Sequence, residues 1–464
     1  ICGKEAPVTD IRYDLFSVDD HIVEPADVWS SRVPSKFRET APHVVEEGGR
    51  EYWCYEDQRT LTMGLNGVAG KPREQWGLEP ARFADMIPGC YDPRFRARDL
   101  LAAGVRASVN FPSLPGFGGR LFAQFKDKEL ALACVRAWND YILDEWCPAG
   151  PEGLFVPMVI TPIWDPPAAA REIQRCAAKG ARALCFVENA VPIGLPSFWS
   201  DFWDPVWATC QEADLPICLH VGSSGANPAI SADTNFLEPI ALGMLGAMMG
   251  SINFMLAPPC HKFPALKLVW SEGGIGWIPA ALERADRQFK RHNYWAKVSD
   301  TLPSEIFERN MWVCMIEEPV GLQFRQHVGV HKILWETDYP HSDTPWPRVV
   351  EGAGEVFAGV PAGEVAAITH LNAEQLFKWQ LADRSLLDEP DIAAWRATLA
   401  ENPYAAVDLP APRMKGITHA TTALHAGDPC PEMHIGTNML ERCGLPLGAN
   451  GRCPAGHQSA LAGV

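Results

Sequence analysis

The sequence predicts an α/β protein, specifically a (β/α)8 TIM barrel with a large insertion after the first strand and a C-terminal extension. Three observations favour this fold class. Short β-like runs alternate with helix-like segments, which is typical of a parallel sheet built from βα units. Eight such runs can be counted along the chain. Several of them end in a histidine or an aspartate, as strands do at the catalytic mouth of a barrel.

The predicted strands follow one another in the order that a barrel requires. They are residues 14–19, 107–111, 154–160, 183–187, 216–220, 266–271, 311–315 and 333–338. The spacing of apolar residues between them predicts helices at 128–146, 166–178, 277–292 and 373–381. A doubly wound sheet is the alternative fold. Only a closed barrel naturally brings the ends of strands one, five and eight around one point.

The domain organisation follows from where the repeat is interrupted. Residues 13–382 are predicted to form the barrel domain. Residues 25–93 are rich in Pro, Gly, Trp and charge, and we expect them to form an insertion over the barrel mouth, as a substrate lid or a dimer surface. Residues 383–464 are predicted to form a C-terminal extension.

The composition limits the classes of function. A chain of 464 residues that is 47% hydrophobic can bury one large core. Its formal net charge of −17 argues against nucleic acid and anionic membranes as partners. No apolar run of about 18 residues predicts a membrane span. No secretory leader is recognised, and most of the 14 cysteines lie singly in apolar segments, so we expect a cytoplasmic protein with buried thiols.

Polar side chains at the ends of three predicted strands predict a metal site. Asp19 and His21 are two residues apart, so they point to the same face of an extended chain. His220 ends the fifth predicted strand and Asp338 ends the eighth. Any one of the four is readily explained as an ordinary strand-end residue, but their matching positions favour a shared divalent cation. Two imidazoles and two carboxylates suit Zn²⁺, Mn²⁺ or Fe²⁺.

Four segments carry a family resemblance in their order and spacing. They are residues 18–25 (VDDHIVEP), 215–222 (LPICLHVG), 263–269 (FPALKLV) and 336–341 (ETDYPH). Together they resemble the amidohydrolase-related family of the metal-dependent amidohydrolase superfamily, in the branch of aminocarboxymuconate semialdehyde and gamma-resorcylate decarboxylases. The resemblance covers residues 13 to 381 and implies that Asp19, His21, His220 and Asp338 hold the cation. Asp19 departs from the family, which has histidine or glutamate at the first position.

The sixth predicted strand departs from the family more strongly. The family has a histidine after this strand, and this chain has Glu272 there. We favour a site role for Glu272, as ligand or proton carrier, over a buried structural carboxylate, because a nearby cation offsets the cost of burying a charge. His341 follows Asp338 by three residues and is predicted to orient the substrate or Asp338. A loop histidine held by its backbone is the alternative.

The resemblance implies a small-molecule enzyme with two candidate reactions. In non-oxidative decarboxylation of an aromatic or unsaturated carboxylic acid, Asp338 would deliver a proton to the carbon that loses CO₂. In hydrolysis of an amide, ester or lactone, the metal would activate water, and Asp338 or Glu272 would shuttle the proton. A third hypothesis is a catalytically silent barrel that serves as a binding or scaffold subunit. The insertion and the extension lead us to expect a homodimer or a higher homo-oligomer.

The C-terminal extension holds a second candidate metal site. Three cysteines and a histidine lie in a Gly- and Pro-rich stretch that is too short for a core of its own: Cys430, Cys443, Cys453 and His457. This set predicts a small arm folded around structural zinc. The spacing lacks a Cys-x-x-Cys pair, so free thiols or a disordered arm remain the alternatives.

Overall fold

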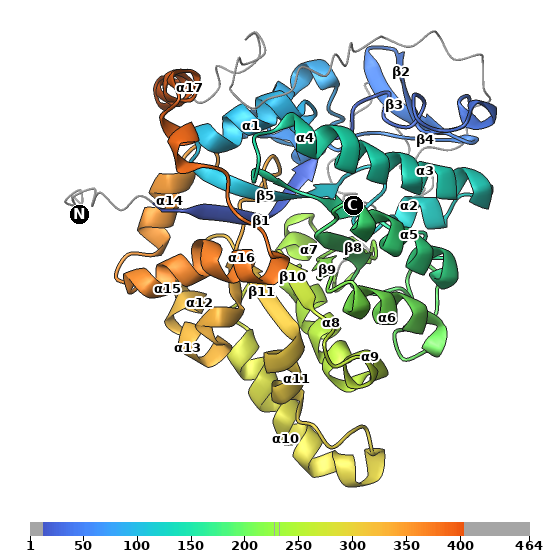
Figure 1. Cartoon of the computed structure of the whole chain (residues 1–464), viewed down its shortest axis with the longest axis vertical. Helices are drawn as coiled ribbons and strands as arrows, with labels where there is room; N and C mark the ends of the chain where they lie inside the picture. The colour runs from blue at the N-terminus through green and yellow to red at the C-terminus, as the bar shows by residue number, and fades with distance from the viewer. Residues whose placement is uncertain (1–12, 227, 232, 403–464) are drawn as a thin grey trace.

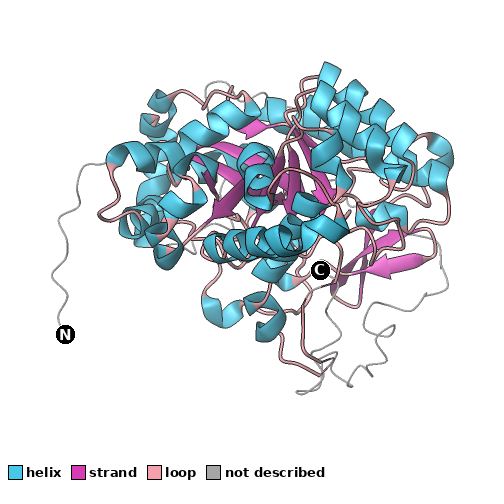
Figure 2. Ribbon diagram, turned by 90° about the horizontal axis from the view of Figure 1, so that it is seen from below, coloured by secondary structure: helices cyan, strands magenta, loops and turns pink. Residues whose placement is uncertain are grey.

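A computed structural model describes residues 13–226, 228–231 and 233–402, in which parallel strands are enclosed by helices (Figures 1 and 2). The parallel strands are β1 (Leu15–Ile22), β5 (Val105–Pro112), β6 (Phe155–Val156), β7 (Met158–Val159), β8 (Ala183–Val187), β9 (Ile217–His220), β10 (Leu268–Ser271), β11 (Met311–Met315) and β12 (Ile333–Trp335). Pro157 separates β6 from β7, and these two short strands occupy the predicted run 154–160. The eight predicted strands are therefore confirmed.

The order of the strands places all their carboxyl ends at one mouth. Parallel pairing gives the orders β1-β5-β6 and β7-β8-β9-β10-β11-β12. Beyond β12, the amide of Asp338 donates to the carbonyl of Asp19 at 2.8 Å, and the amide of His21 donates to the carbonyl of Tyr339 at 2.7 Å. These two bonds join the last strand segment to the first. The mouth is where a barrel carries its functional residues.

Helices cover the outside of the strands. The longer ones are α1 (Pro93–Ala102), α3 (Lys128–Tyr141), α5 (Pro166–Ala178), α6 (Asp204–Glu212), α8 (Met244–Leu256), α10 (Ile278–Ala296), α11 (Pro303–Asn310), α14 (Val349–Val356), α16 (Asn372–Phe377) and α17 (Pro390–Glu401). The predicted helix 166–178 coincides with α5, because the Asp165 side chain caps its first turn and Pro166 starts it.

Short helical segments complete the connections. They are α2 (Arg120–Ala123), α4 (Cys147–Ala149), α7 (Leu237–Ala241), α9 (Pro258–Lys262), α12 (Pro319–Gln323), α13 (Arg325–Val328), α15 (Ala362–Ala366), η6 (Ile142–Trp146), η7 (Asp201–Trp203), η8 (Val330–Lys332), η9 (Ala367–Leu371) and η10 (Arg384–Asp388). The π-helical η6 continues α3 to the end of the predicted helix 128–146.

Residues 25–93 contain an antiparallel sheet that stands apart from the central strands (Figure 2). It consists of β2 (His43–Glu47), β3 (Arg50–Tyr55) and β4 (Gln58–Thr60). Single 3-10 turns fill the rest of the segment: η1 (Ser35–Phe37), η2 (Gly64–Gly67), η3 (Arg73–Gln75), η4 (Phe83–Asp85) and η5 (Pro88–Cys90). Trp53 of β3 is buried and meets Trp29 of the same segment edge to face at 5.4 Å between ring centroids. The indole of Trp29 donates to the carbonyl of Cys134 in α3 at 3.1 Å, which ties the segment to a barrel helix.

The core lies inside and around the strands. Large side chains such as Trp138, Trp207 and Trp270 are almost fully buried, and burial of each contributes about 2–3 kcal/mol. All eight residues of β1 are buried, including Asp19, Asp20 and His21. Ionisable groups inside a core require hydrogen bonds, opposite charges or a metal ion. The side chains on the two faces of β1 meet this requirement in different ways.

The chain continues beyond the last barrel helix as η10 and α17, which pack on α1. The indole of Trp395 in α17 donates to Asp99 of α1 at 2.8 Å. Residues 403–464, with Cys430, Cys443, Cys453 and His457, lie outside the described residues, so the zinc arm stays a prediction. None of the helices in the described part of the chain is long and apolar enough to cross a membrane.

Candidate metal centre

The four predicted ligands meet at the mouth of the barrel, and each is at most 2% exposed. The His21 Nε2 atom lies 3.3 Å from Asp19 Oδ1 and 3.1 Å from Asp338 Oδ1. The His220 Nε2 atom lies 3.3 Å from His21 Nε2 and 3.4 Å from Asp19 Oδ2. Side chains from β1, β9 and the segment after β12 therefore converge on one point, as the strand-end pattern predicts.

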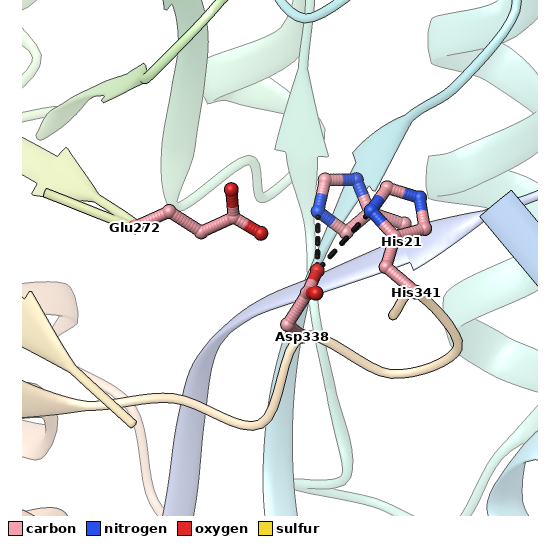
Figure 3. A group of neighbouring side chains, drawn as sticks. All are labelled: His21, Glu272, Asp338 and His341. Atoms are coloured by element: carbon pink, nitrogen blue, oxygen red, sulfur yellow. Dashed lines mark ion pairs between the residues drawn. The ribbon is translucent and has the colours of Figure 1, made fainter. Parts of the chain in front are cut away.

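Glu272 and His341 complete the cluster (Figure 3). Glu272 Oε2 lies 3.6 Å from His220 Nε2, and His341 Nδ1 lies 3.2 Å from Asp338 Oδ1. The imidazoles of His341 and His21 stack at 3.6 Å between centroids. Two overlapping sets have potential ligand atoms within 4.8 Å of one another: Asp19, His21 and His220, and His21, Glu272, Asp338 and His341. His21 belongs to both sets, so all six side chains surround the same space.

The carboxylates of this cluster have unused hydrogen-bonding capacity. Both carboxylate oxygens of Asp19 and Oδ1 of Asp338 are buried without a hydrogen-bond donor in the described structure. An unpaired buried carboxylate oxygen is costly, and such atoms in native structures call for an unseen partner. A divalent cation is the partner that this donor set fits, because carboxylates and neutral imidazoles are ligands of Zn²⁺, Mn²⁺ and Fe²⁺.

The protonation of the cluster also suits a cation. Burial lowers the pKa of His220, and burial together with the neighbouring His341 holds the pKa of His21 well below its usual range. Both imidazoles are therefore neutral, as metal ligands must be. The Nδ1 atom of His220 lies 2.6 Å from the carbonyl of Val221, a contact that directs Nε2 into the cluster. Burial and nearby carboxylates raise the pKa of Asp19 and Asp338 well above the ordinary value.

Two of the carboxylates sit on unusual backbone. Glu272 has φ of 52° and Asp338 has φ of 51°, in the left-handed region that residues other than glycine rarely occupy. Glu272 directly follows β10, and Asp338 follows β12 by three residues. Backbone strain of this kind costs on the order of 1–3 kcal/mol and concentrates at functional sites. Four described residues outside the site, Glu56, Asp214, Lys297 and Lys378, share this conformation, so it supports the two positions only together with their place in the cluster.

A cavity of about 190 Å³ opens on Glu272, Asp338 and His341. Its other wall is largely apolar and is formed by Phe117, Phe236, Pro239, Ile240 and Met244. The ring of Phe117 lies 4.0 Å from the imidazole of His220, between centroids. A polar floor below an apolar wall suits a ligand with an apolar body and a polar end.

Sequence reasoning missed two further carboxylates of the site. Glu336 is 1% exposed, accepts a hydrogen bond from the amide of Glu272 at 3.1 Å, and adds to the raised pKa of Asp19. Asp343 lines the cavity, and its amide donates to Asp338 Oδ2 at 3.3 Å. Glu336 precedes Asp338 by two residues, the same spacing that identified Asp19 and His21, so its signal was available.

The parallel strands and the buried cluster at their carboxyl ends are the arrangement of a barrel enzyme with a candidate metal site at its mouth. The family model described as "Amidohydrolase" matches residues 45–379, which is most of the chain. The protein therefore belongs to the amidohydrolase family. The match begins after Asp19 and His21, so the assignment of these two residues rests on their geometry.

Known proteins resemble this chain over most of their length. Gamma-resorcylate decarboxylase of Rhodococcus jostii (strain RHA1) is 26% identical over 332 residues, which cover 64% of this chain and 93% of that protein. The structure of an amidohydrolase from Mycobacterium avium subsp. paratuberculosis K-10 superposes with a TM-score of 0.62 at 20% identity, over 79% of this chain and 100% of that one. A dihydroxybenzoic acid decarboxylase from Polaromonas sp. JS666, with bound manganese and 2-nitroresorcinol, superposes with a TM-score of 0.52 at 17% identity, over 79% and 97%.

Proposed function

We propose that this chain is a metal-dependent decarboxylase of an aromatic or unsaturated carboxylic acid, and that Asp19, His21, His220 and Asp338 hold one divalent cation. The observation that carries the metal site is the set of unpaired buried oxygens of Asp19 and Asp338 beside two neutral imidazoles. The apolar wall of the cavity supports a flat, apolar substrate body. The decarboxylase activity named for the Rhodococcus relative supports the reaction type.

The residues of the mouth have separable tasks in this reaction. A divalent cation held by Asp19, His21, His220 and Asp338 would supply positive charge that offsets the negative charge of the acid. Asp338 delivers a proton to the carbon that bears the carboxylate; the bond to that carboxylate then breaks, its electron pair returns to the ring or double bond, and CO₂ leaves. His341 orients Asp338 through the 3.2 Å contact of its Nδ1 atom. Phe117 and the apolar wall offer an apolar surface to the body of the substrate.

Hydrolysis of an amide, ester or lactone is the second candidate, and Glu272 is the feature that favours it. A cation with Asp19, Asp338 and two neutral imidazoles makes a neutral cluster, and an ionised Glu272 makes it negative. A negative cluster repels a carboxylate substrate. A carboxylate at the cavity, 3.6 Å from His220, is also placed to take a proton from attacking water.

A panel of substrates separates the two reactions. The protein is loaded separately with Mn²⁺, Zn²⁺ and Fe²⁺, with Mn²⁺ first because the Polaromonas structure holds manganese. Hydroxybenzoates and unsaturated acids are assayed for released CO₂, and amides, esters and lactones for a new amine, alcohol or carboxylate. We expect CO₂ from at least one acid, and release that is slower by about 10²-fold or more with Asp338→Asn. Hydrolysis products without CO₂ would favour the second candidate.

The scaffold hypothesis predicts a different outcome. A silent barrel would release neither product, and the double variant Asp19→Ala with His21→Ala would alter neither its stability nor its binding of any ligand. We expect the double variant to lose the metal instead. The comparison needs only metal content and thermal unfolding, so it does not depend on knowing the substrate.

A further inference from the structure

A second cavity adjoins the metal cavity below the insertion. Its volume is about 250 Å³, and it shares Met63, Asn66, Phe117 and Gly222 with the metal cavity. Its remaining wall comes from β3 and β4 of the insertion, from the segment after β5 and from α2. The proposed reaction requires only the metal cavity, so the second one is available for another part of the substrate.

The two cavities differ in the charge of their walls. Among the described residues that line the metal cavity, the charged groups are the carboxylates Glu272, Asp338 and Asp343. The described lining of the second cavity contains two guanidinium groups, those of Arg59, which pairs with Glu47, and Arg120. Its single carboxylate, Glu24, accepts hydrogen bonds from backbone amides, including that of Ser113 at 2.9 Å. The joined space therefore has carboxylates at the metal end and guanidinium groups at the other end, where Arg120 is the one that the Glu47 ion pair does not involve.

The side chain of Arg120 packs against the backbone of two glycines at the edge of the second cavity. Its guanidinium lies against Gly225, where an added Cβ would overlap Nη1 and approach Cζ to 2.8 Å. Gly225 has φ of +74°, so both its conformation and this close approach favour glycine. At Gly116, which has φ of +69°, an added Cβ would lie 3.5 Å from Arg120 Nε. Burial lowers the pKa of Arg120, and the attraction of Glu188 opposes this. A guanidinium fixed in a partly buried wall is an anion-binding group.

Unsatisfied polar atoms in the same wall indicate a polar ligand. The Ser113 hydroxyl oxygen and the Arg59 Nε atom are buried without a hydrogen-bond partner in the described part of the chain, and both residues line this cavity. Buried polar atoms are otherwise almost always paired. The same cavity is also lined by apolar groups of Trp53, Leu61, Leu114 and Leu121, which suit a hydrocarbon arm.

We propose that the substrate is a diacid, with one end at the metal centre and a second carboxylate, carried on a short hydrocarbon arm, bound by Arg120 and Ser113 in the second cavity. This inference rests on the proposed function, because it places the reacting acid at Asp338. In this proposal Arg120 determines which substrates bind, and Asp338 and the metal ligands at the barrel mouth still carry the reaction.

Binding by the Mn²⁺-loaded full chain tests the proposal with three probes. They are 2-hydroxybenzoate, the same acid with a 2-carboxyethyl group on the ring, and the same acid with an uncharged 2-carbamoylethyl group. Substituents at ring positions 4 and 5 are compared, and dissociation constants are measured by titration calorimetry. We expect the carboxyethyl probe to bind about tenfold or more tightly than the other two, the value of one charged hydrogen-bonded pair.

Two variants assign that preference to the second cavity. Arg120→Met removes the charge and keeps the stem, and we expect the preference for the carboxyethyl probe to disappear, while Arg120→Lys restores part of it. Gln124→Glu adds a negative charge at an exposed position of the same wall, so it weakens the same probe without endangering the fold. Arg348→Met is the matched control, since Arg348 is 74% exposed and does not line this cavity.

Each outcome decides one point. Equal binding of the three probes, or a preference that survives both Arg120→Met and Gln124→Glu, would overturn the second-carboxylate subsite and leave the proposed function standing. Failure of every probe to bind the metal-loaded wild type would overturn the proposed function, and the subsite with it. A preference lost in both cavity variants and retained in Arg348→Met would establish Arg120 as a specificity-determining residue.

Discussion

Asp19 and Asp20 are neighbours in the sequence and both are completely buried, yet their carboxylates, on opposite faces of β1, differ in their hydrogen-bond donors. Asp20 accepts hydrogen bonds from the Ser108 and Thr337 hydroxyls and from the amide of Tyr339, with Arg96 nearby. Neither oxygen of Asp19 has a hydrogen-bond partner of ordinary geometry in the described structure, and the Ser271 hydroxyl offsets only part of the rise in its pKa. Protein donors satisfy the carboxylate on one face, and the oxygens on the other face point to the space where we propose that the cation binds. Buried charge therefore indicates a site only where its partners are missing.

The largest effect is expected on catalysis by Asp338, in the cluster at the mouth of the barrel. Asp338→Asn removes the proposed proton donor and should lower turnover of the acid substrate about 10²–10⁴-fold. The measurement is kcat for CO₂ release by metal-loaded protein, with metal content determined in parallel. A variant that keeps its metal and its turnover would show that another group carries the proton.

The paired variants Asp20→Asn and Asp19→Asn test the comparison itself. Asp20→Asn places an amide donor against existing donors, so the free energy of unfolding should fall by about 2–4 kcal/mol. Asp19→Asn removes an unpaired buried charge, so the metal-free protein should be as stable as wild type or more stable. Urea unfolding of chelator-treated proteins measures both. Equal losses in the two variants would contradict the distinction.

Metal removal should separate the two faces again. A cation present at 100 to 1,000 times its Kd stabilises the fold by about 3–4 kcal/mol, so chelation should lower the Tm of wild type. Asp20→Asn should show the same decrease from its lower starting point, because its metal site is intact. Asp19→Asn should show little change. A full metal-dependent shift in Asp19→Asn would remove Asp19 from the ligand set.

Glu24 lies between these two cases, because its carboxylate is paired with donors and burial still raises its pKa. Burial raises its pKa to about 7, although the amides of Ser113 and Leu114 and the indole of Trp138 donate to it. The folded state therefore binds this proton more tightly than the unfolded state does. Its contribution to stability is present at pH 5 and is lost as the pH rises towards 7, by on the order of 2 kcal/mol. Urea unfolding between pH 5 and 8 should show this loss in wild type and not in Glu24→Gln.

The smallest effect is expected at α17. Trp395→Phe keeps an aromatic ring beside Arg98 but removes the 2.8 Å hydrogen bond to Asp99, so the free energy of unfolding should fall by about 1 kcal/mol and the metal content should stay unchanged.

The predicted zinc arm of the tail can be tested by truncation. Because the hydrogen bond of Trp395 to Asp99 ties α17 to α1, the shortened chain should keep α17 and end at residue 402. A zinc equivalent lost on this truncation would support an arm formed by Cys430, Cys443, Cys453 and His457.

The barrel and the meeting of its polar strand ends could be predicted because both follow from periodicity. The spacing of Asp19 and His21 fixes their common face whatever surrounds them. The positive φ values of Glu272 and Asp338 could not be predicted, because tertiary packing imposes them against the preference of the residues.

The antiparallel sheet of the insertion was missed although a local signal existed. Gly48 and Gly49 both have positive φ and join β2 to β3, as expected of a two-residue hairpin turn. An interpretation of residues 25–93 by composition alone passes over this signal. The second cavity depends on side chains from that sheet and from α2, so no local pattern predicts it.

Elemental analysis of the purified protein tests the central claim, that the unpaired inward face of β1 is a metal site. Wild type is compared with His220→Ala and Asp20→Asn, each before and after reconstitution with Mn²⁺, Zn²⁺ or Fe²⁺. We predict about one equivalent of a divalent metal in wild type and Asp20→Asn, and its loss in His220→Ala. No metal in wild type, with none retained after reconstitution, would contradict the account.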